Sequence, residues 1–318
     1  MPPGVNIREV LPKDAIPSID KPVFDTEHFG DDDDEVAVVE GSIAKAYPLR
    51  ILDYHEIVND EIDDRPIAVT WCPLCGSAVV FDRTVDDQVL SLGVSGKLAD
   101  DDLVMYDRET GSEWKQSLGS CIAGAFEGTS LTMLPAAIVP YGVFRETHPE
   151  GVVLQPTGTV SEAASDDDNP APIEYDRRPY ERYFEAEGFG LSAHRREPDQ
   201  RTWSRDDIGP KEVVLGIEIE GEAIGYPRSQ VEAAGGVVVD TIGDTEVIVV
   251  AIEDGIHAFE HPGGEVTLDD DILVVDGFTV SPATGRGGDG TKLTRIPAIQ
   301  LFAFTWQDDH GEDAFFFA

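Results

Sequence analysis

Alternating apolar and polar positions dominate the chain from residue 35 onward and predict a β-rich protein. Runs rich in valine, isoleucine and aromatic side chains recur between turn residues, most clearly at residues 65–73 (RPIAVTWCP) and 77–83 (SAVVFDR). Runs of this kind are typical of β-strands. Residues 49–60 (LRILDYHEIVND) are instead short and helix-like. We therefore predict an α+β fold in which strands predominate and helices are short.

The same order of apolar runs and turns occurs twice, which predicts an internal duplication. Residues 36–48 (VAVVEGSIAKAYP) match residues 215–227 (LGIEIEGEAIGYP), and both segments keep a Tyr-Pro step. Residues 131–150 similarly match residues 293–312. The matches keep their order across the whole unit, which supports a duplication. The repeat is also far longer than the repeats of solenoid proteins.

The repeats and the segments between them suggest four parts of the chain. Residues 1–34 form a proline-containing, extended lead-in, and residues 35–155 form the first repeat. Residues 156–210 connect the repeats through an acidic loop and an aromatic stretch that we expect to pack back onto a repeat. Residues 211–318 form the second repeat. The predicted fold thus consists of two related, β-dominated halves.

A Cys-Pro-Leu-Cys-Gly turn in residues 70–82 (TWCPLCGSAVVFD) holds two of the three cysteines. Two cysteines at this spacing can direct both sulfurs to one point, either to bind a metal ion or to form a small redox disulfide. In a thioredoxin-like site a helix follows the pair, whereas residues 77–81 favour a returning strand. We therefore predict a hairpin turn that carries Cys72 and Cys75. The third cysteine, Cys121, is interpreted as a buried strand residue.

The second repeat lacks these chemical groups. Residues 71–76 (WCPLCG) correspond to residues 251–256 (AIEDGI), and Ala234 and Gly235 stand opposite His55 and Glu56. If both repeats share a fold, that fold does not require the cysteines. The cysteine turn is therefore interpreted as a functional site of the first repeat, and the second repeat as a degenerate supporting partner.

The leading hypothesis is a transition-metal site made by Cys72, Cys75 and His55, with Glu56 as a neighbouring catalytic candidate. Cysteine and histidine ligands favour zinc or copper. Three protein ligands leave a fourth position open, for which His148 and Asp102 are further candidates. A zinc-protease helix is excluded because Asn59 occupies the position of its second histidine.

Two alternatives belong to other functional classes. In a thiol-disulfide oxidoreductase, Cys72 would attack a substrate disulfide and Cys75 would resolve the mixed disulfide. In a non-enzymatic binding module, both cysteines would be inert core residues.

The net charge of the chain restricts the compartments and the binding partners that we expect for it. With 63 acidic and 23 basic residues the formal net charge is −40, which indicates adaptation to a high-salt cytosol where charge repulsion is screened. No basic patch is available for nucleic acid or an anionic membrane. The sequence shows neither a signal-peptide pattern nor an apolar run of membrane-spanning length. We expect a cytoplasmic protein that binds a metal ion or a small molecule, with its oligomeric state left open.

Three long blocks resemble a prokaryotic family catalogued as domain of unknown function number 3179. They are residues 45–60 (KAYPLRILDYHEIVND), 66–83 (PIAVTWCPLCGSAVVFDR) and 102–114 (DLVMYDRETGSEW). The family has no established activity. The resemblance implies that residues of these blocks act together with the cysteines, and we expect the following ones to bind a cofactor or ligand: Tyr47, Asn59, Tyr106, Asp107 and Arg108. The chain departs from the family pattern at residues 99–101 (ADD).

Overall fold

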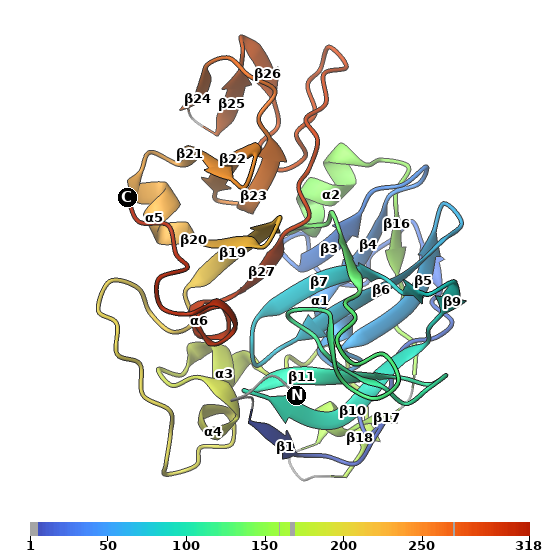
Figure 1. The fold of residues 1–318 in the computed structure, drawn as a ribbon. Helices are drawn as coiled ribbons and strands as arrows, with labels where there is room; N and C mark the ends of the chain where they lie inside the picture. The colour runs from blue at the N-terminus through green and yellow to red at the C-terminus, as the bar shows by residue number, and fades with distance from the viewer. Residues whose placement is uncertain (1–5, 159, 166–168, 270) are drawn as a thin grey trace.

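The fold is known from a computed structural model that describes residues 6–158, 160–165, 169–269 and 271–318 (Figure 1). Strands are far more numerous than helices, which confirms the predicted β-rich α+β class. The longest helix, α6 (Ala303–His310), spans 8 residues. Within the described ranges, no helix has the length and apolar character needed to cross a membrane.

The first half begins with a hairpin, a short helix and a three-stranded meander, and later adds two strands and a helix. The Tyr-Pro step ends the second strand of the hairpin, and the helix starts directly after it. The last strand, β15, returns to pair with β3 beside β4. The elements are β3 (Glu35–Val39), β4 (Lys45–Pro48), α1 (Leu49–Leu52), β5 (Ile57–Ile62), β6 (Arg65–Cys72), β7 (Ser77–Asp82), β14 (Thr132–Leu134), β15 (Ala137–Pro140) and α2 (Tyr141–Thr147).

The second half has a counterpart for each of these elements except β14, and the counterparts pair in the same way. Its last strand, β27, returns to pair with β19 beside β20, and α6 follows it. The elements are β19 (Val213–Ile219), β20 (Glu222–Pro227), α5 (Arg228–Ala233), β21 (Val237–Ile242), β22 (Thr245–Ile252), β23 (Gly255–Glu260), β27 (Ile299–Phe302) and α6. Between β23 and β27 lies a separate small sheet of β24 (Val266–Asp269), β25 (Ile272–Val275) and β26 (Phe278–Val280).

The two halves share a sheet. Strand β27 pairs with β7 through Gln300 and Ala78, so the strand order β20-β19-β27-β7-β6-β5 runs from one half into the other (Figure 1). Strand β23 contacts β15 in turn. The largest hydrophobic core also draws residues from both halves, including Cys72, Val214 and Trp306. The segments 35–155 and 211–318 therefore pack as one body.

A five-stranded sheet is inserted into the first half after β7. Its strand order is β1-β10-β11-β12-β13, so the lead-in contributes the edge strand β1. A two-stranded hairpin precedes it. The elements are β1 (Ile7–Glu9), β8 (Thr84–Val85), β9 (Gln88–Val89), β10 (Leu92–Ala99), β11 (Asp102–Asp107), β12 (Glu113–Lys115) and β13 (Ser120–Ala123).

Pairs of aspartates form the turns of three hairpins in the first half. Residues 63–64, 86–87 and 100–101 all have φ between 48° and 68°. Positive φ at both central residues defines a type I′ turn, which glycine and asparagine usually occupy but which aspartate also tolerates. The last of these turns makes Asp102 the first residue of β11. Residues 99–101, where the chain departs from the family pattern, therefore form a tight hairpin turn.

The remaining elements belong to the lead-in, the end of the first half and the connecting segment. Strands β2 and β16 extend the sheet of β15, β3 and β4. Helices α3 and α4 of the connecting segment lie beside the inserted sheet (Figure 1). These elements are β2 (Phe24–Asp25), β16 (Val152–Leu154), β17 (Val160–Ser161), the 3-10 helix Glu162–Ala164, β18 (Ala171–Pro172), α3 (Glu181–Glu185) and α4 (Gly190–His194).

Candidate functional site

The cysteine turn is a hairpin turn between β6 and β7, as the sequence predicts. Cys72 pairs with Ser77, and the backbone N–H of Cys75 donates to the carbonyl oxygen of Cys72 at 3.2 Å. Gly76 has φ 57°, and a Cβ at this position would lie 2.7 Å from the Phe302 ring. Glycine is therefore required both by the backbone conformation and by the close approach of β27.

Cys72 and Cys75 meet a carboxylate from the inserted sheet. The two sulfurs and one carboxylate oxygen of Asp102 all lie within 4.8 Å of one another, and the three side chains are buried. The Oδ2 atom of Asp102 accepts a hydrogen bond from the N–H of Ser117 at 2.9 Å, whereas Oδ1 has no hydrogen-bond partner among the described residues. Because leaving a buried polar atom unpaired is costly, this oxygen is available for a ligand at the cluster.

Burial disfavours negative charge on all three groups. It raises the pKa of the Cys72 thiol, and burial together with the neighbouring Cys72 raises the pKa of Cys75 well above its usual value. Burial also raises the pKa of Asp102 to about 6, although the nearby Lys115 ammonium opposes the shift. A bound cation would reverse this balance by stabilising the deprotonated sulfurs and carboxylate. The cluster therefore offers three ligand atoms to a cation, and a cation would stabilise their deprotonated forms.

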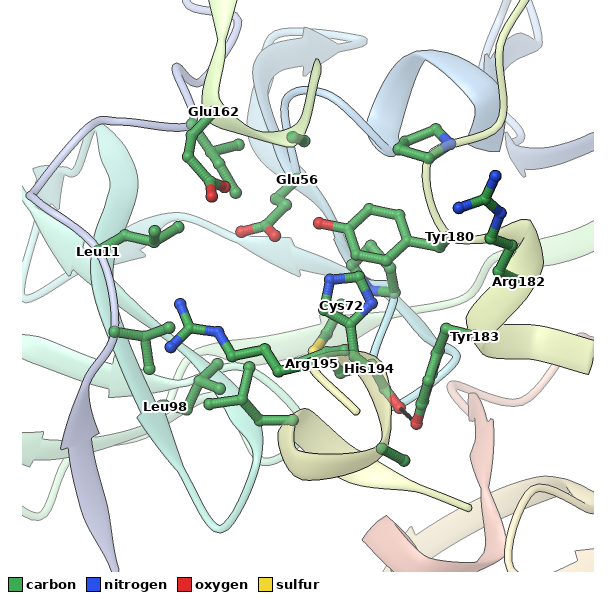
Figure 2. Close-up of a pocket in the computed structure, with 18 of the residues that line it drawn as sticks. Leu11, Glu56, Cys72, Leu98, Glu162, Tyr180, Arg182, Tyr183, His194 and Arg195 are labelled. Atoms are coloured by element: carbon green, nitrogen blue, oxygen red, sulfur yellow. Dashed lines mark hydrogen bonds between the residues drawn. The ribbon is translucent and has the colours of Figure 1, made fainter. Parts of the chain in front are cut away.

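A cavity of about 1180 Å³ adjoins the cluster, and Cys72 forms part of its wall. The connecting segment supplies Tyr180, Tyr183 and His194 to the same wall (Figure 2). The ring of His194 lies 5.2 Å from that of Tyr180 and 5.9 Å from that of Tyr183, centroid to centroid. The Tyr183 hydroxyl donates to the carbonyl oxygen of Leu74 at 2.6 Å, so the connecting segment is fastened directly to the cysteine turn.

Glu56 lies in this cavity as a buried carboxyl group. Its side chain points toward Glu162 and the Tyr180 hydroxyl in Figure 2, and it is 7% exposed. Burial, reinforced by the nearby carboxylates of Glu162, Asp53 and Asp102, raises the pKa of Glu56 to about 8. Its backbone has φ 57°, an uncommon conformation for a non-glycine residue. Glu56 can therefore hold a proton at neutral pH beside the cavity.

His55 contacts other groups than the sulfurs. Its Nδ1 donates to the carbonyl oxygen of Pro17 at 2.7 Å, and its Nε2 lies 2.6 Å from the Tyr175 hydroxyl. Among the described residues, the group that brings its ligand atoms within 4.8 Å contains Asp102 and does not contain His55. The turn after α1 directs Glu56 into the cavity and its neighbour His55 toward the lead-in. His55 thus joins the lead-in to the connecting segment.

Three of the residues that the family resemblance singles out bind the lead-in. Asn59 donates to Asp20 at 2.7 Å, and Arg108 contacts the same carboxylate at 3.0 Å. The Tyr106 hydroxyl donates to Asp14 at 2.6 Å. These contacts place Asn59, Tyr106 and Arg108 on the surface that holds residues 14–20 against the first half.

The other two residues make local contacts. The Tyr47 hydroxyl donates to Asp60 at 2.7 Å, and Asp107 accepts a hydrogen bond from the Trp114 ring nitrogen at 3.1 Å. The second half repeats the first of these contacts, because the Tyr226 hydroxyl donates to Asp240 at 2.9 Å. A contact that occurs in both halves supports the fold they share.

Two further candidates lie elsewhere. Cys121 is buried in β13, and its thiol donates to the carbonyl oxygen of Ala123 at 3.3 Å. The Nε2 atom of His148, after α2, lies 3.6 Å from Glu40. Sequence reasoning did not assign Tyr180, Tyr183 or His194 to the site. Their clustering in an aromatic stretch indicated packing, but nothing in that stretch identified the turn that it covers.

The fold and the site define a β-rich protein in which two thiols and a carboxylate are buried beside a large cavity. The chain belongs to the family described as "Protein of unknown function (DUF3179)", which matches residues 13–313. No curated protein and no solved structure matches the chain.

Proposed function

We propose that Cys72, Cys75 and Asp102 bind a transition-metal ion that acts on a small molecule in the adjoining cavity. The observation that carries the proposal is the cluster itself, in which three buried ligand atoms lie within 4.8 Å of one another. The unpaired Oδ1 of Asp102 is the second support, because a metal ion would give it a partner.

The donor set favours zinc or copper. Thiolates are soft ligands that suit these metals, whereas magnesium and calcium prefer sites made of oxygen alone. Two sulfurs and one carboxylate oxygen leave one position of a tetrahedral zinc site for water or a substrate. Cys72 lines the cavity, and the open position would face the same side. Bound there, a metal ion would polarise a substrate oxygen or activate water.

Glu56 is the proposed proton-transfer group. A carboxyl group whose pKa lies near 8 is mostly protonated at neutral pH and can donate a proton to a group in the cavity. Tyr180, whose hydroxyl points toward Glu56 in Figure 2, would position it. His194, on the same cavity wall, is a second residue placed to contact a bound molecule.

The charge of the cavity wall favours an anionic small molecule. Of the described residues that line it, six are lysine or arginine and five are aspartate or glutamate, whereas the whole chain has 23 basic and 63 acidic residues. Arg182 and Arg196 are part of this wall, and neither forms an ion pair with any described residue. Basic side chains are therefore concentrated where a carboxylate or phosphate group could contact them.

We further propose that the two halves arose by internal duplication and that the second lost the site. The common element order and strand pairing of the halves, which differ by the additional strand β14, support this history, as does the Tyr47–Asp60 contact that Tyr226 and Asp240 repeat.

Metal analysis of the full chain, purified under reducing conditions and equilibrated with Zn²⁺, tests the proposal. We expect about one bound zinc per chain, with binding lost in Cys72→Ser and weakened at least tenfold in Asp102→Asn. Cys121→Ser is the matched control, because it removes a buried cysteine outside the cluster and should leave zinc binding unchanged. Equal zinc binding by the wild type and Cys72→Ser would overturn the proposal.

The thiol-disulfide hypothesis gives a different result in the same experiment. It predicts metal-free protein in which Cys72 and Cys75 form a reversible disulfide. The raised pKa values of both thiols argue against it, because the thiolate is the attacking species and burial disfavours it here.

A further inference from the structure

A second cavity, of about 490 Å³, lies away from the cysteines where the two halves meet. One side comes from the strands β3 and β15 of the first half, and the other from the segment of residues 283–295 that leads into β27. Much of its wall is apolar, and these side chains include Val38, Val39, Ile62, Leu134, Val139 and Leu293.

Arg295 brings a positive charge to this wall without a matching carboxylate. Its guanidinium donates to the carbonyl oxygen of Ala283, lies 3.4 Å from Nδ1 of His257 and stacks 4.8 Å above the Phe259 ring. Burial lowers the pKa of Arg295 to about 10. No acidic side chain among the described residues forms an ion pair with it. In a chain with 63 acidic and 23 basic residues, a partly buried arginine without a carboxylate partner is unexpected.

Nearby charged groups do not neutralise Arg295. Glu40, the acidic residue of the cavity wall, binds Arg286 at 2.6 Å and Lys292 at 2.8 Å. Arg65, also in the wall, pairs with Asp82 at 2.8 Å. His257 is fully buried, and burial lowers its pKa well below the usual value, so its neutral ring accepts from Arg295 and adds no charge. Glu40 also acts on Arg295 and raises its pKa, but this one carboxylate is shared with Arg286 and Lys292. Arg295 and Lys292 therefore give the cavity wall an excess of positive charge, and of the two only Arg295 has no carboxylate in ion-pair contact among the described residues.

We propose that this cavity binds a small carboxylate with an apolar body, whose carboxylate group pairs with Arg295. A planar guanidinium can hold both oxygens of a carboxylate, and the apolar walls would cover an aliphatic chain. A singly charged carboxylate matches the one guanidinium of the wall that lacks a carboxylate partner, and the apolar side chains around it disfavour a multiply charged phosphate. The site is separate from the cysteine cluster, so it does not depend on the proposed metal.

Isothermal titration calorimetry of the full chain with sodium octanoate tests this proposal, with 1-octanol as a probe of equal length and no charge. We expect saturable binding of octanoate, weaker by about tenfold or more in Arg295→Gln, and much weaker binding of 1-octanol. Arg65→Gln is the matched control, because its guanidinium lines the same cavity but is already paired, and it should change octanoate affinity by less than about threefold.

Because Arg295 also contacts Ala283 and Phe259, its replacement could disturb folding, and a second variant avoids that difficulty. Ala136 lies between β14 and β15, is partly exposed and lines the cavity, so Ala136→Phe should fill the space and abolish octanoate binding while the circular dichroism spectrum stays unchanged. Absence of octanoate binding to the wild type, unchanged affinity in Ala136→Phe, or equal affinity for 1-octanol would each overturn the proposal.

Discussion

The β6–β7 turn and the β22–β23 turn occupy equivalent places in the two halves but differ in length and surroundings. In the first half, Cys72 pairs with Ser77 and the turn between them has four residues; in the second, Ile252 pairs with Gly255 and the turn has two. The adjoining strands are paired in the same way. A two-residue turn without cysteine is therefore sufficient to connect these two strands, and the turn of the first half has two residues more.

The two turns also contact different structures. The first is buried, with the inserted sheet supplying Asp102 and the connecting segment supplying Tyr183. In the second, Glu253 is exposed, and Arg228 of α5 donates to the carbonyl oxygen of Ile252 at 2.7 Å. The cysteine turn thus differs from the second turn in three respects: it is longer, an inserted sheet packs against it, and a connecting segment covers it.

Replacing both cysteines by alanine should make the first turn chemically similar to the second. We expect the double variant Cys72→Ala/Cys75→Ala to bind no zinc and to keep the wild-type circular dichroism spectrum. A chelator should lower the midpoint of thermal unfolding of the zinc-bound wild type by several degrees and leave that of the variant unchanged, because only the wild type gains free energy from bound metal. An unfolded double variant would show instead that the cysteines are required by the fold.

Glu56 provides a pH-dependent test of this comparison, because Gly236 occupies its place in the second half. The carbonyl oxygens of Glu56 and Gly236 accept equivalent hydrogen bonds, from the N–H groups of Trp71 and Ala251. Its pKa is about 8 in the folded protein and near 4.5 when unperturbed, so folding favours the protonated form. The resulting stabilisation is complete below pH 4.5 and is lost as the pH rises through about 8. Glu56→Gln should therefore be more stable than the wild type above pH 8, by roughly 5 kcal/mol at about 1.4 kcal/mol per pKa unit.

Urea unfolding of metal-free protein between pH 5 and 9 measures this difference. Glu61→Gln, which changes an exposed residue of β5, is the control and should follow the wild-type pH profile. Asp53 and Asp102 also make the free energy of unfolding depend on pH, because burial raises their pKa values to about 7 and about 6. This contribution is present in the wild type and in both variants. If the wild type and Glu56→Gln lost stability equally as the pH rises, the raised pKa of Glu56 would be contradicted.

The smallest expected effect concerns the tyrosine contact that both halves share. Tyr47→Phe and Tyr226→Phe each remove a hydrogen bond to an aspartate, and each should lower the free energy of unfolding by about 1 kcal/mol. Neither should change zinc binding, because both tyrosines support the fold. Loss of zinc binding in Tyr47→Phe alone would show that this contact belongs to the site.

The sequence was sufficient for the fold class and for the cysteine turn, because both depend on local patterns. Runs of β-branched and aromatic residues identified β6 and β7, and the spacing of Cys72 and Cys75 identified the turn. Asp102 was one of two weaker candidates, because its approach to the sulfurs depends on how the inserted sheet packs against the turn. His55 illustrates the opposite difficulty. Its position before the cysteine-bearing strand suggests a metal ligand. The two neighbouring side chains point in different directions, however, and the backbone directs Glu56 into the cavity and His55 away from it.

The pairing of β7 with β27 means that the cysteine turn is supported by a strand that is synthesised long after the turn itself. The backbone N–H of Phe302 donates to the carbonyl oxygen of Cys75 at 2.7 Å, so the cysteine turn gains this support only when residue 302 has left the ribosome. Until then β7 has an open edge, and open edges pair readily with other strands. Such long-range pairing is slow to form. We therefore expect the cysteine turn of a nascent chain to lack its full support until β27 has emerged and paired with β7.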